Sequence, residues 1–205
     1  MEYRSDSPNS LGFFDYTDSF SIGTLGPVGT SSEQAALFLS KKIVKIGGEV
    51  FKVNLYDSFE DVLEALSRNE IKLAVVPNAY ERVNEYYINP ETVLVDLFIH
   101  STPSYGLVKR PNEDIPAVGC SIVTHPAPRK LIDLLLSRVK SPPRNFKVSL
   151  VKSTSVAANM VKSGEADLAI TNEIAARKNG LEIIEMYGAI KMSWSVFAKN
   201  NEVML

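Results

Sequence analysis

The sequence predicts an α/β protein, because three observations point the same way. Short runs rich in β-branched and aromatic residues alternate along the chain with segments whose apolar residues recur at helical spacing. Hydrophobic residues make up 45% of the chain and charged residues 22%, which is ordinary globular usage and argues against disorder or a coiled coil. The 205 residues suffice for one large domain or for two lobes of roughly 100 residues each.

The predicted elements of the first half follow an extension over residues 1–19, which has no apolar period. Strands are expected at residues 21–25, 50–55, 71–76, 93–99, 105–109 and 121–124, and helices at residues 30–41 and 57–69. The second of these helices begins with Ser58 and Asp61 at the spacing of a capping box. The near-continuous apolar run at 71–76 is typical of a strand that is covered on both faces.

The second half repeats the alternation. Helices are expected at residues 126–138, 154–162 and 172–179, and strands at residues 146–151, 168–171, 181–186 and 194–199. Pro126 suits the first turn of a helix, and Gly180 stands where a helix ends in a left-handed residue.

Composition and charge exclude several classes of function. The balance of 22 Lys+Arg against 24 Asp+Glu gives a net charge of -2, unlike the basic footprint of a nucleic-acid-binding protein. The one cysteine, Cys120, cannot form an internal disulfide, and with only His100 and His125 beside it no metal cluster is expected. No apolar run approaches the ~20 residues that span a bilayer, and no signal-peptide pattern opens the chain. We therefore expect a cytoplasmic protein without a metal, a membrane or a nucleic-acid partner.

Two segments share one form: a strand, a polar turn and a helix that starts with hydroxyl side chains. These side chains are Thr30, Ser31 and Ser32 in the first segment and Ser153, Thr154 and Ser155 in the second. A helix start offers unpaired N–H groups and the positive end of the helix dipole, and ligands of open α/β folds bind beyond the carboxyl ends of strands. The pair therefore predicts a site for a substrate with two carboxylates, although ordinary N-caps explain the same spacing.

The first segment resembles the opening motif of the prephenate dehydratase domain, and further matches follow in order. They are Thr24-Leu25-Gly26-Pro27-Val28-Gly29-Thr30-Ser31-Ser32-Glu33-Gln34-Ala35-Ala36, Tyr56-Asp57-Ser58-Phe59, Ala74-Val75-Val76-Pro77, Thr124-His125-Pro126, Ser153-Thr154-Ser155 and Gly180-Leu181. The resemblance implies a two-lobed α/β fold like that of periplasmic binding proteins, with an inter-lobe cleft. The catalytic domain would span residues 20–205, with residues 20–99 and 187–205 in one lobe and residues 100–186 in the other.

Departures from the dehydratase pattern point to a narrower group. The dehydratase Glu-Asn-Ser element is absent around Tyr80, and Ser195-Val196 stands where the dehydratases have Thr-Arg. The further matches are Thr102-Pro103-Ser104-Tyr105-Gly106-Leu107, Arg110-Pro111, Thr171-Asn172-Glu173 and Met192-Ser193-Trp194-Ser195. On these residues the chain is identified as a member of the non-aromatising prephenate decarboxylases of bacilysin, aeruginosin and salinosporamide biosynthesis. The resemblance implies loss of CO2 with ring protonation to dihydro-4-hydroxyphenylpyruvate, no cofactor, and a homodimer.

The resemblance and the residue types together suggest the site residues. Catalytic groups are expected among His125, Tyr80, Tyr105 and Ser195. Substrate contacts are expected from Thr30, Ser31, Ser32, Arg110, Ser153, Thr154, Ser155, Asn172, Trp194 and Val196. Val196 in place of an arginine, with Trp194 beside it, would make one wall of the site drier and less acidic, so that CO2 leaves and the ring hydroxyl stays.

Alternatives stand beside these expectations. Arg110 also suits a surface ion pair, Asn172 a helix cap and Trp194 an ordinary core position. A buried tyrosine is often a core residue with a satisfied hydroxyl. For the whole chain, the alternative functions are a prephenate dehydratase forming phenylpyruvate and a non-catalytic protein that binds prephenate-like molecules.

Overall fold

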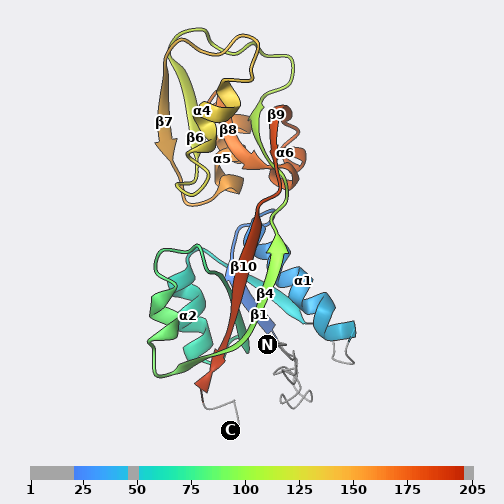
Figure 1. Cartoon of the computed structure of the whole chain (residues 1–205), viewed down its shortest axis with the longest axis vertical. Coiled ribbons are helices and arrows are strands. Elements are labelled where there is room, and N and C mark those ends of the chain that lie inside the picture. Colours follow the sequence, from blue (N-terminus) through green and yellow to red (C-terminus); the bar gives the residue numbers. More distant parts are fainter. Residues whose placement is uncertain (1–20, 46–50, 201–205) are drawn as a thin grey trace, which may run out of the picture. The chain divides into compact units, whose positions relative to one another are not determined.

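The computed structural model describes residues 21–45 and 51–200 (Figure 1). This part of the chain forms two compact units, each built on one five-stranded sheet. Unit 1 contains Ala35–His100 and the described parts of Met1–Leu25 and Met192–Leu205, and unit 2 contains Gly26–Gln34 and Ser101–Lys191. The extension expected at residues 1–19 lies outside the described residues.

Strands and helices alternate as the sequence predicts, with bounds that shift by a few residues. The strands are β1 (Ser21–Leu25), β2 (Lys52–Tyr56), β3 (Leu73–Pro77), β4 (Thr92–Ser101), β5 (Tyr105–Lys109), β6 (Cys120–Thr124), β7 (Phe146–Leu150), β8 (Leu168–Asn172), β9 (Glu182–Gly188) and β10 (Lys191–Lys199). The helices are α1 (Ser31–Lys45), α2 (Phe59–Ser67), α3 (Asn84–Tyr87), α4 (Leu131–Leu136), α5 (Thr154–Ser163) and α6 (Glu173–Lys178). The strand order is β2-β1-β3-β10-β4 in unit 1 and β7-β6-β8-β5-β9 in unit 2.

Helices cover both faces of the sheet in unit 1. β1 pairs in parallel with β2 and β3, whereas β10 runs antiparallel to β3. On one face Ala36 and Leu39 of α1 belong to the same buried cluster as Val196 of β10. On the other face Val62 and Leu66 of α2 join the apolar side chains of β3. Figure 1 shows α1 and α2 on opposite sides of this sheet.

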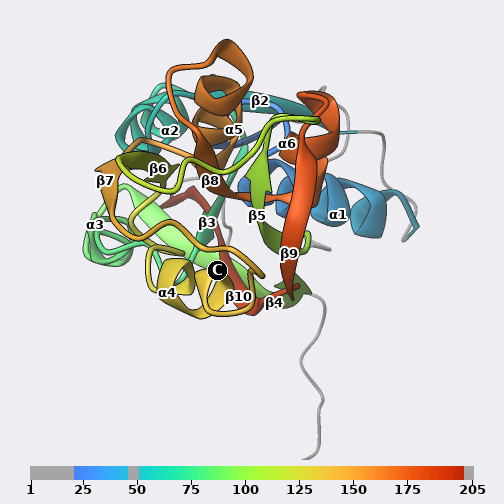
Figure 2. The ribbon, with the colours of Figure 1, turned by 90° about the horizontal axis from the view of Figure 1, so that it is seen from above.

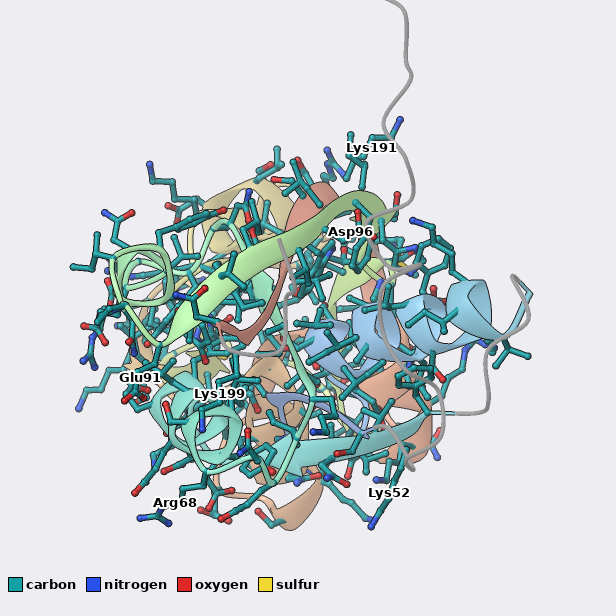
Figure 3. The ribbon with its side chains drawn as sticks, turned by 90° about the horizontal axis from the view of Figure 1, so that it is seen from below. Lys52, Arg68, Glu91, Asp96, Lys191 and Lys199 are labelled. Atoms are coloured by element: carbon teal, nitrogen blue, oxygen red, sulfur yellow. The ribbon has the colours of Figure 1, made fainter. Side chains whose placement is uncertain are left out.

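Several charged side chains lie on the outside of unit 1. Figure 3 shows Lys52 at the start of β2, Arg68 just after α2 and Asp96 on β4. Lys199 at the end of β10 lies beside α2, where its Nζ donates a 2.7 Å hydrogen bond to Ser67 O. This bond joins the last strand to the end of α2.

Unit 2 has the same three layers. β6 pairs in parallel with β7 and β8, and β5 runs antiparallel to β8. Ile132 and Leu135 of α4 pack on one face of the sheet, and Ala157 of α5 and Ala176 of α6 pack on the other. Figure 2 shows α5 and α6 close to β8 and β5. Among the described residues, no helix has the length and apolar character needed to cross a membrane.

The helix predicted at residues 126–138 is wrong at both ends, because α4 spans only Leu131–Leu136. Pro128 has no N–H to donate and disfavours the helical conformation of the residue before it. The preceding residues form tight turns instead, in which Arg129 N–H donates to Pro126 O at 3.2 Å and Leu131 N–H to Pro128 O at 2.9 Å.

α3 has no counterpart among the predicted elements. It is a single turn of four residues without a side-chain cap, so it has too little apolar period to be read from sequence. Tyr86 fixes it to the core, since its ring is buried and its hydroxyl donates to Phe59 O at 2.5 Å. The neighbouring Tyr87 is thereby placed against Phe197, edge to face at 5.0 Å between ring centroids.

The predicted lobe division differs from the two units at residues 26–34 and 187–191, which both belong to unit 2, and at His100, which belongs to unit 1. For the first segment the physical reason is a pair of side chains of unit 2. Asn172 donates to Gly29 O, and Tyr105 bonds to Ser31. These tertiary hydrogen bonds, which no local pattern encodes, hold the segment on unit 2.

Candidate active site

The candidate site lies at one edge of the unit 2 sheet, where parallel strands end. His125 follows β6, Ser153 follows β7, and Asn172 is the last residue of β8. Tyr105 begins the antiparallel strand β5 and pairs with Asn172 in the sheet register, so it lies at the same edge. This is the edge at which open α/β sheets bind ligands.

The start of α5 presents donors that the protein does not use. Ser153 caps the helix by accepting the Val156 N–H at 3.1 Å, and Ala157 N–H donates to Ser153 O. Among the described residues this leaves the N–H groups of Thr154 and Ser155 without a hydrogen bond. The Ser155 hydroxyl, in a side chain that is 3% exposed, also has no partner there. Buried polar groups are rarely left unpaired, so these donors point to an anionic ligand.

The start of α1 belongs to the same unit and has the same form. Thr30 caps it, because Glu33 N–H donates to the Thr30 hydroxyl at 3.1 Å. The Glu33 carboxylate accepts the Gly29 N–H at 2.6 Å, since Thr30 N–H is already bonded to Pro27 O. The two bonds resemble those of a Thr-x-x-Glu capping box, with Gly29 in place of Thr30 as the donor to Glu33. Ser31 and Ser32 follow in the first turn.

Tyr105 connects the two helix starts. Its hydroxyl lies 3.1 Å from the Ser31 hydroxyl and also bonds to the side chain of Thr154. Burial raises the pKa of Tyr105, and its hydrogen bonds to Ser31 and Thr154 only partly oppose that rise. The phenol is therefore neutral near pH 7 and is a fixed proton-bearing group beside both helix starts.

Asn172 is buried and uses both ends of its amide within the protein. Its Oδ1 accepts the Ala175 N–H at 2.9 Å and so caps α6, which is the alternative to the predicted substrate contact. Its Nδ2 donates to Gly29 O at 2.8 Å. Gly29 has a φ of +95°, in the left-handed region that favours glycine, and its open side faces the Ser155 hydroxyl.

Two residues predicted for this site are engaged in local contacts. Arg110 Nε bonds to both carboxylate oxygens of Glu113 at 2.7 Å, and Nη1 bonds to Val161 O and Ala166 O. Val161 is in the last turns of α5, so the structure does not bring Arg110 to the start of that helix. His125 lies at the correct edge, and its Nδ1 accepts the Ala127 N–H at 3.2 Å.

The remaining predicted residues lie in unit 1. Trp194 is 1% exposed and Val196 0% exposed, and both side chains belong to a core cluster there. The Trp194 indole N–H donates to His100 O at 3.2 Å. The Tyr80 hydroxyl donates to the Glu60 carboxylate at 2.9 Å, and burial followed by this bond raises the pKa of Tyr80 to about 12.

Ser195 is fully buried in unit 1, where its hydroxyl donates to Asn78 Oδ1 at 2.6 Å and accepts from the Tyr87 hydroxyl at 2.7 Å. Sequence reasoning missed both partners. Asn78 directly follows the matched motif Ala74-Val75-Val76-Pro77 but is not part of it, and Tyr87 lies in the short helix α3. Within residues 21–45 and 51–200, no group of acidic, His or Cys side chains is arranged to hold a metal ion.

A comparison with models of protein families finds no match. Among curated proteins, the chain is 48% identical over 184 residues to a prephenate decarboxylase of Planktothrix agardhii, which covers 89% of each chain. It is 36% identical over 200 residues to a prephenate decarboxylase of Bacillus subtilis, covering 94% of this chain and 95% of the relative.

Solved structures show the same fold at low sequence identity. A prephenate dehydratase from Arthrobacter aurescens has a TM-score of 0.61 at 15% identity, and the match covers 87% of this chain but only 60% of the dehydratase. A periplasmic substrate-binding protein from Coxiella burnetii has a TM-score of 0.56 at 15% identity, covering 89% and 85% of the two chains. These likenesses confirm the predicted α/β fold of the dehydratase and periplasmic-binding-protein kind, and they show the fold alone.

Proposed function

This chain belongs to the prephenate decarboxylase family, and from that premise we propose that it removes CO2 from prephenate without making the ring aromatic. The observation that carries the proposal is the 48% identity, across 89% of both chains, to a protein named prephenate decarboxylase. The dehydratase in the structural comparison shares 15% identity with this chain, which shows the fold alone. Among the described residues the N–H groups of Ser31 and Ser32, like those of Thr154 and Ser155, have no hydrogen bond, so the two helix starts can bind a carboxylate.

The substrate carries one carboxylate on ring carbon C1 and another on its 2-oxo acid side chain. Only the first is lost. An interaction that stabilises the departing carboxylate more than the transition state would slow the reaction, because catalysis depends on the difference between the two. We therefore assign the retained 2-oxo acid carboxylate to the N–H groups of Ser31, Ser32, Thr154 and Ser155. Binding energy gained there anchors the ring for the reaction.

The reaction leaves one electron pair on the ring when CO2 departs and adds one proton to the ring. The bond from C1 to its carboxylate breaks and CO2 leaves. The electron pair forms a C1–C2 double bond, the former C2–C3 pair takes a proton at C3, and the hydroxyl at C4 stays. The product is a conjugated cyclohexadiene. The ring system accepts the electrons, so the proposal needs no cofactor.

We assign the ring proton to Tyr105, because it is the neutral acid held against both helix starts. Proton transfer in step with CO2 loss avoids a free carbanion. Tyr105 then regains a proton from water, and the hydroxyls of Ser31 and Thr154 stabilise the transient phenolate. The assignment leaves His125, Tyr80 and Ser195, which were the other predicted catalytic groups, outside this step.

Two further expectations belong to the proposal. A cytoplasmic location suits the free, buried thiol of Cys120, which would persist in a reducing compartment. A homodimer is the state that the family resemblance favours, and size-exclusion chromatography with light scattering measures it.

The experiment that tests the function is incubation of the purified protein with prephenate at neutral pH. We expect CO2 release in proportion to prephenate consumed, and a product whose proton NMR spectrum retains the carbinol proton at C4 and shows diene signals. Formation of phenylpyruvate would establish the dehydratase alternative. Tight prephenate binding in calorimetry without CO2 release would establish a binding protein.

A further inference from the structure

We propose that Asn172 is a positioning residue, which holds Gly29 and the first turn of α1 in the geometry that binds the substrate carboxylate. The inference rests on the proposed function, because it concerns the same carboxylate site. It differs from the expectation that Asn172 contacts the substrate itself. The argument depends on where each hydrogen bond of Asn172 goes.

Gly29 is held on both of its peptide sides. Its N–H donates to the Glu33 carboxylate at 2.6 Å, and its carbonyl accepts from Asn172 Nδ2 at 2.8 Å. Glu33 is part of α1, so the first bond fixes Gly29 to the helix that follows it. Asn172 lies 143 residues away, so the second bond fixes that helix start to the end of β8.

Asn172 is itself rigid, because three neighbours define its place. It is 0% exposed, its Oδ1 caps α6 at Ala175, and its backbone is paired with Tyr105 in the sheet. A buried polar group whose hydrogen bonds are satisfied within the protein is held rigidly. Asn172 can therefore fix Gly29 relative to the edge of the sheet.

The position of Gly29 sets the relation between the two helix starts. The open side of Gly29 faces the Ser155 hydroxyl, which would lie 3.6 Å from a Cβ atom at that residue, and it also faces Ala175. Two residues later, Ser31 bonds to Tyr105. If Gly29 moved away from Asn172, the N–H groups of Ser31 and Ser32 would move relative to those of Thr154 and Ser155.

Two substitutions separate the cap of α6 from the bond to Gly29. Serine is a good N-cap but is too short to reach Gly29, so Asn172→Ser keeps the cap and removes the bond without adding charge. Aspartate caps equally well but has no N–H to donate, so Asn172→Asp places a carboxylate oxygen against the Gly29 carbonyl.

We expect Asn172→Ser to raise KM for prephenate about fivefold to tenfold, the usual effect of one hydrogen bond, with kcat within about twofold of wild type. Asn172→Asp should raise KM at least as much, because its charge also repels the substrate carboxylate. Amide hydrogen exchange should become faster over residues 29–33 in both variants. A merely structural role would lower the melting temperature and the active fraction while KM stayed constant.

Asn179→Ser is the matched control, since Asn179 Nδ2 also donates to a backbone carbonyl, that of Ala175 at 2.9 Å, at the other end of α6. It should leave KM and the exchange of residues 29–33 unchanged. Unchanged KM or unchanged exchange in Asn172→Ser would overturn the inference while the wild type still released CO2. If the wild type released no CO2, the proposed function would fail. Calorimetry of phenylpyruvate binding would then test the positioning role of Asn172. Equal affinities of Asn172→Ser and wild type for phenylpyruvate would refute that role.

Discussion

The hydroxyl oxygens of Ser31 and Tyr105 lie 3.1 Å apart, although 74 residues separate them in the sequence. Tyr105 also bonds to Thr154, so one phenol joins the first turn of α1 to the first turn of α5. Two helix starts that are each ordinary N-caps in sequence thereby become one polar cluster in unit 2. The unpaired hydroxyl of Ser155 distinguishes this cluster from a purely structural one.

Tyr105→Phe tests the assignment of the ring proton. We expect kcat to fall by about a hundredfold or more, the usual range for loss of a general acid, because phenylalanine keeps the ring but has no proton to give. Steady-state CO2 release measures it. Tyr187→Phe makes the same change at a side chain of unit 2 that is 44% exposed, and it should leave kcat unaltered. A Tyr105→Phe enzyme with wild-type kcat would mean that another group protonates the ring.

Ser155→Ala tests whether the unpaired hydroxyl serves the substrate. Removing a buried, unsatisfied polar atom should stabilise the fold by about 1 kcal/mol, which raises the melting temperature by roughly 2–4 °C. KM for prephenate should nevertheless rise about fivefold, because one hydrogen bond to the ligand is lost. Thermal unfolding and initial rates measure the two effects.

Ser163→Ala is the control for that change, because Ser163 is exposed at the far end of α5 and donates to Met160 O. It should alter neither KM nor the melting temperature by much. If Ser155→Ala lowered the melting temperature and left KM constant, Ser155 would be a structural residue and the ligand role would be refuted.

Sequence patterns predicted the alternation of strands and helices and the caps at Ser58, Thr30 and Ser153, because these depend on residues within one turn of each other. The patterns also marked the two hydroxyl-rich helix starts, and the family resemblance marked Tyr105. They did not predict the bond from Asn172 to Gly29, which joins residues 143 positions apart. Arg110 shows the same limit, since its type suits a carboxylate ligand but its neighbours Glu113 and Ala166 already occupy it.

Val196→Arg tests how unit 1 uses the position at which dehydratases have arginine. Val196 is 0% exposed within the core of unit 1, so an arginine there would bury an unpaired charge. We expect a loss of about 3 kcal/mol or more in the free energy of unfolding. Val196→Ile, which keeps the apolar character, should cost no more than about 1–3 kcal/mol. An arginine variant as stable as wild type would show that the side chain at position 196 reaches solvent. Val196 would then line the site, as the predicted dry wall requires.

Asp167→Asn tests a pH dependence of stability in unit 2. Burial alone would raise the pKa of Asp167, but hydrogen bonds from the Ser121 hydroxyl and N–H, together with the charge of Arg110, hold it below the ordinary value of 3.8. A carboxyl group with a lowered folded-state pKa stabilises the fold above its unfolded pKa and loses that effect as the pH falls through the folded value.

We therefore expect Asp167→Asn to melt a few degrees below wild type at pH 7, about 3 °C for a 1 kcal/mol loss in the free energy of unfolding. This difference in melting temperature should disappear as the pH falls below about 4. Calorimetry between pH 3 and pH 7 measures it, with the exposed Asp114→Asn as control. A difference in melting temperature that stayed constant with pH would show that the charge of Asp167 does not contribute to stability.

The central claim is that the starts of α1 and α5 bind the 2-oxo acid carboxylate that the reaction retains. The most direct measurement is a ¹⁵N–¹H NMR titration of the wild-type protein with phenylpyruvate, which carries this group on a ring and has no carboxylate to lose from that ring. The account predicts that the largest saturable shifts are those of the amides of Ser31, Ser32, Thr154 and Ser155. Saturable shifts that left these four amides in place and centred on Asn78 and Ser195 would contradict it.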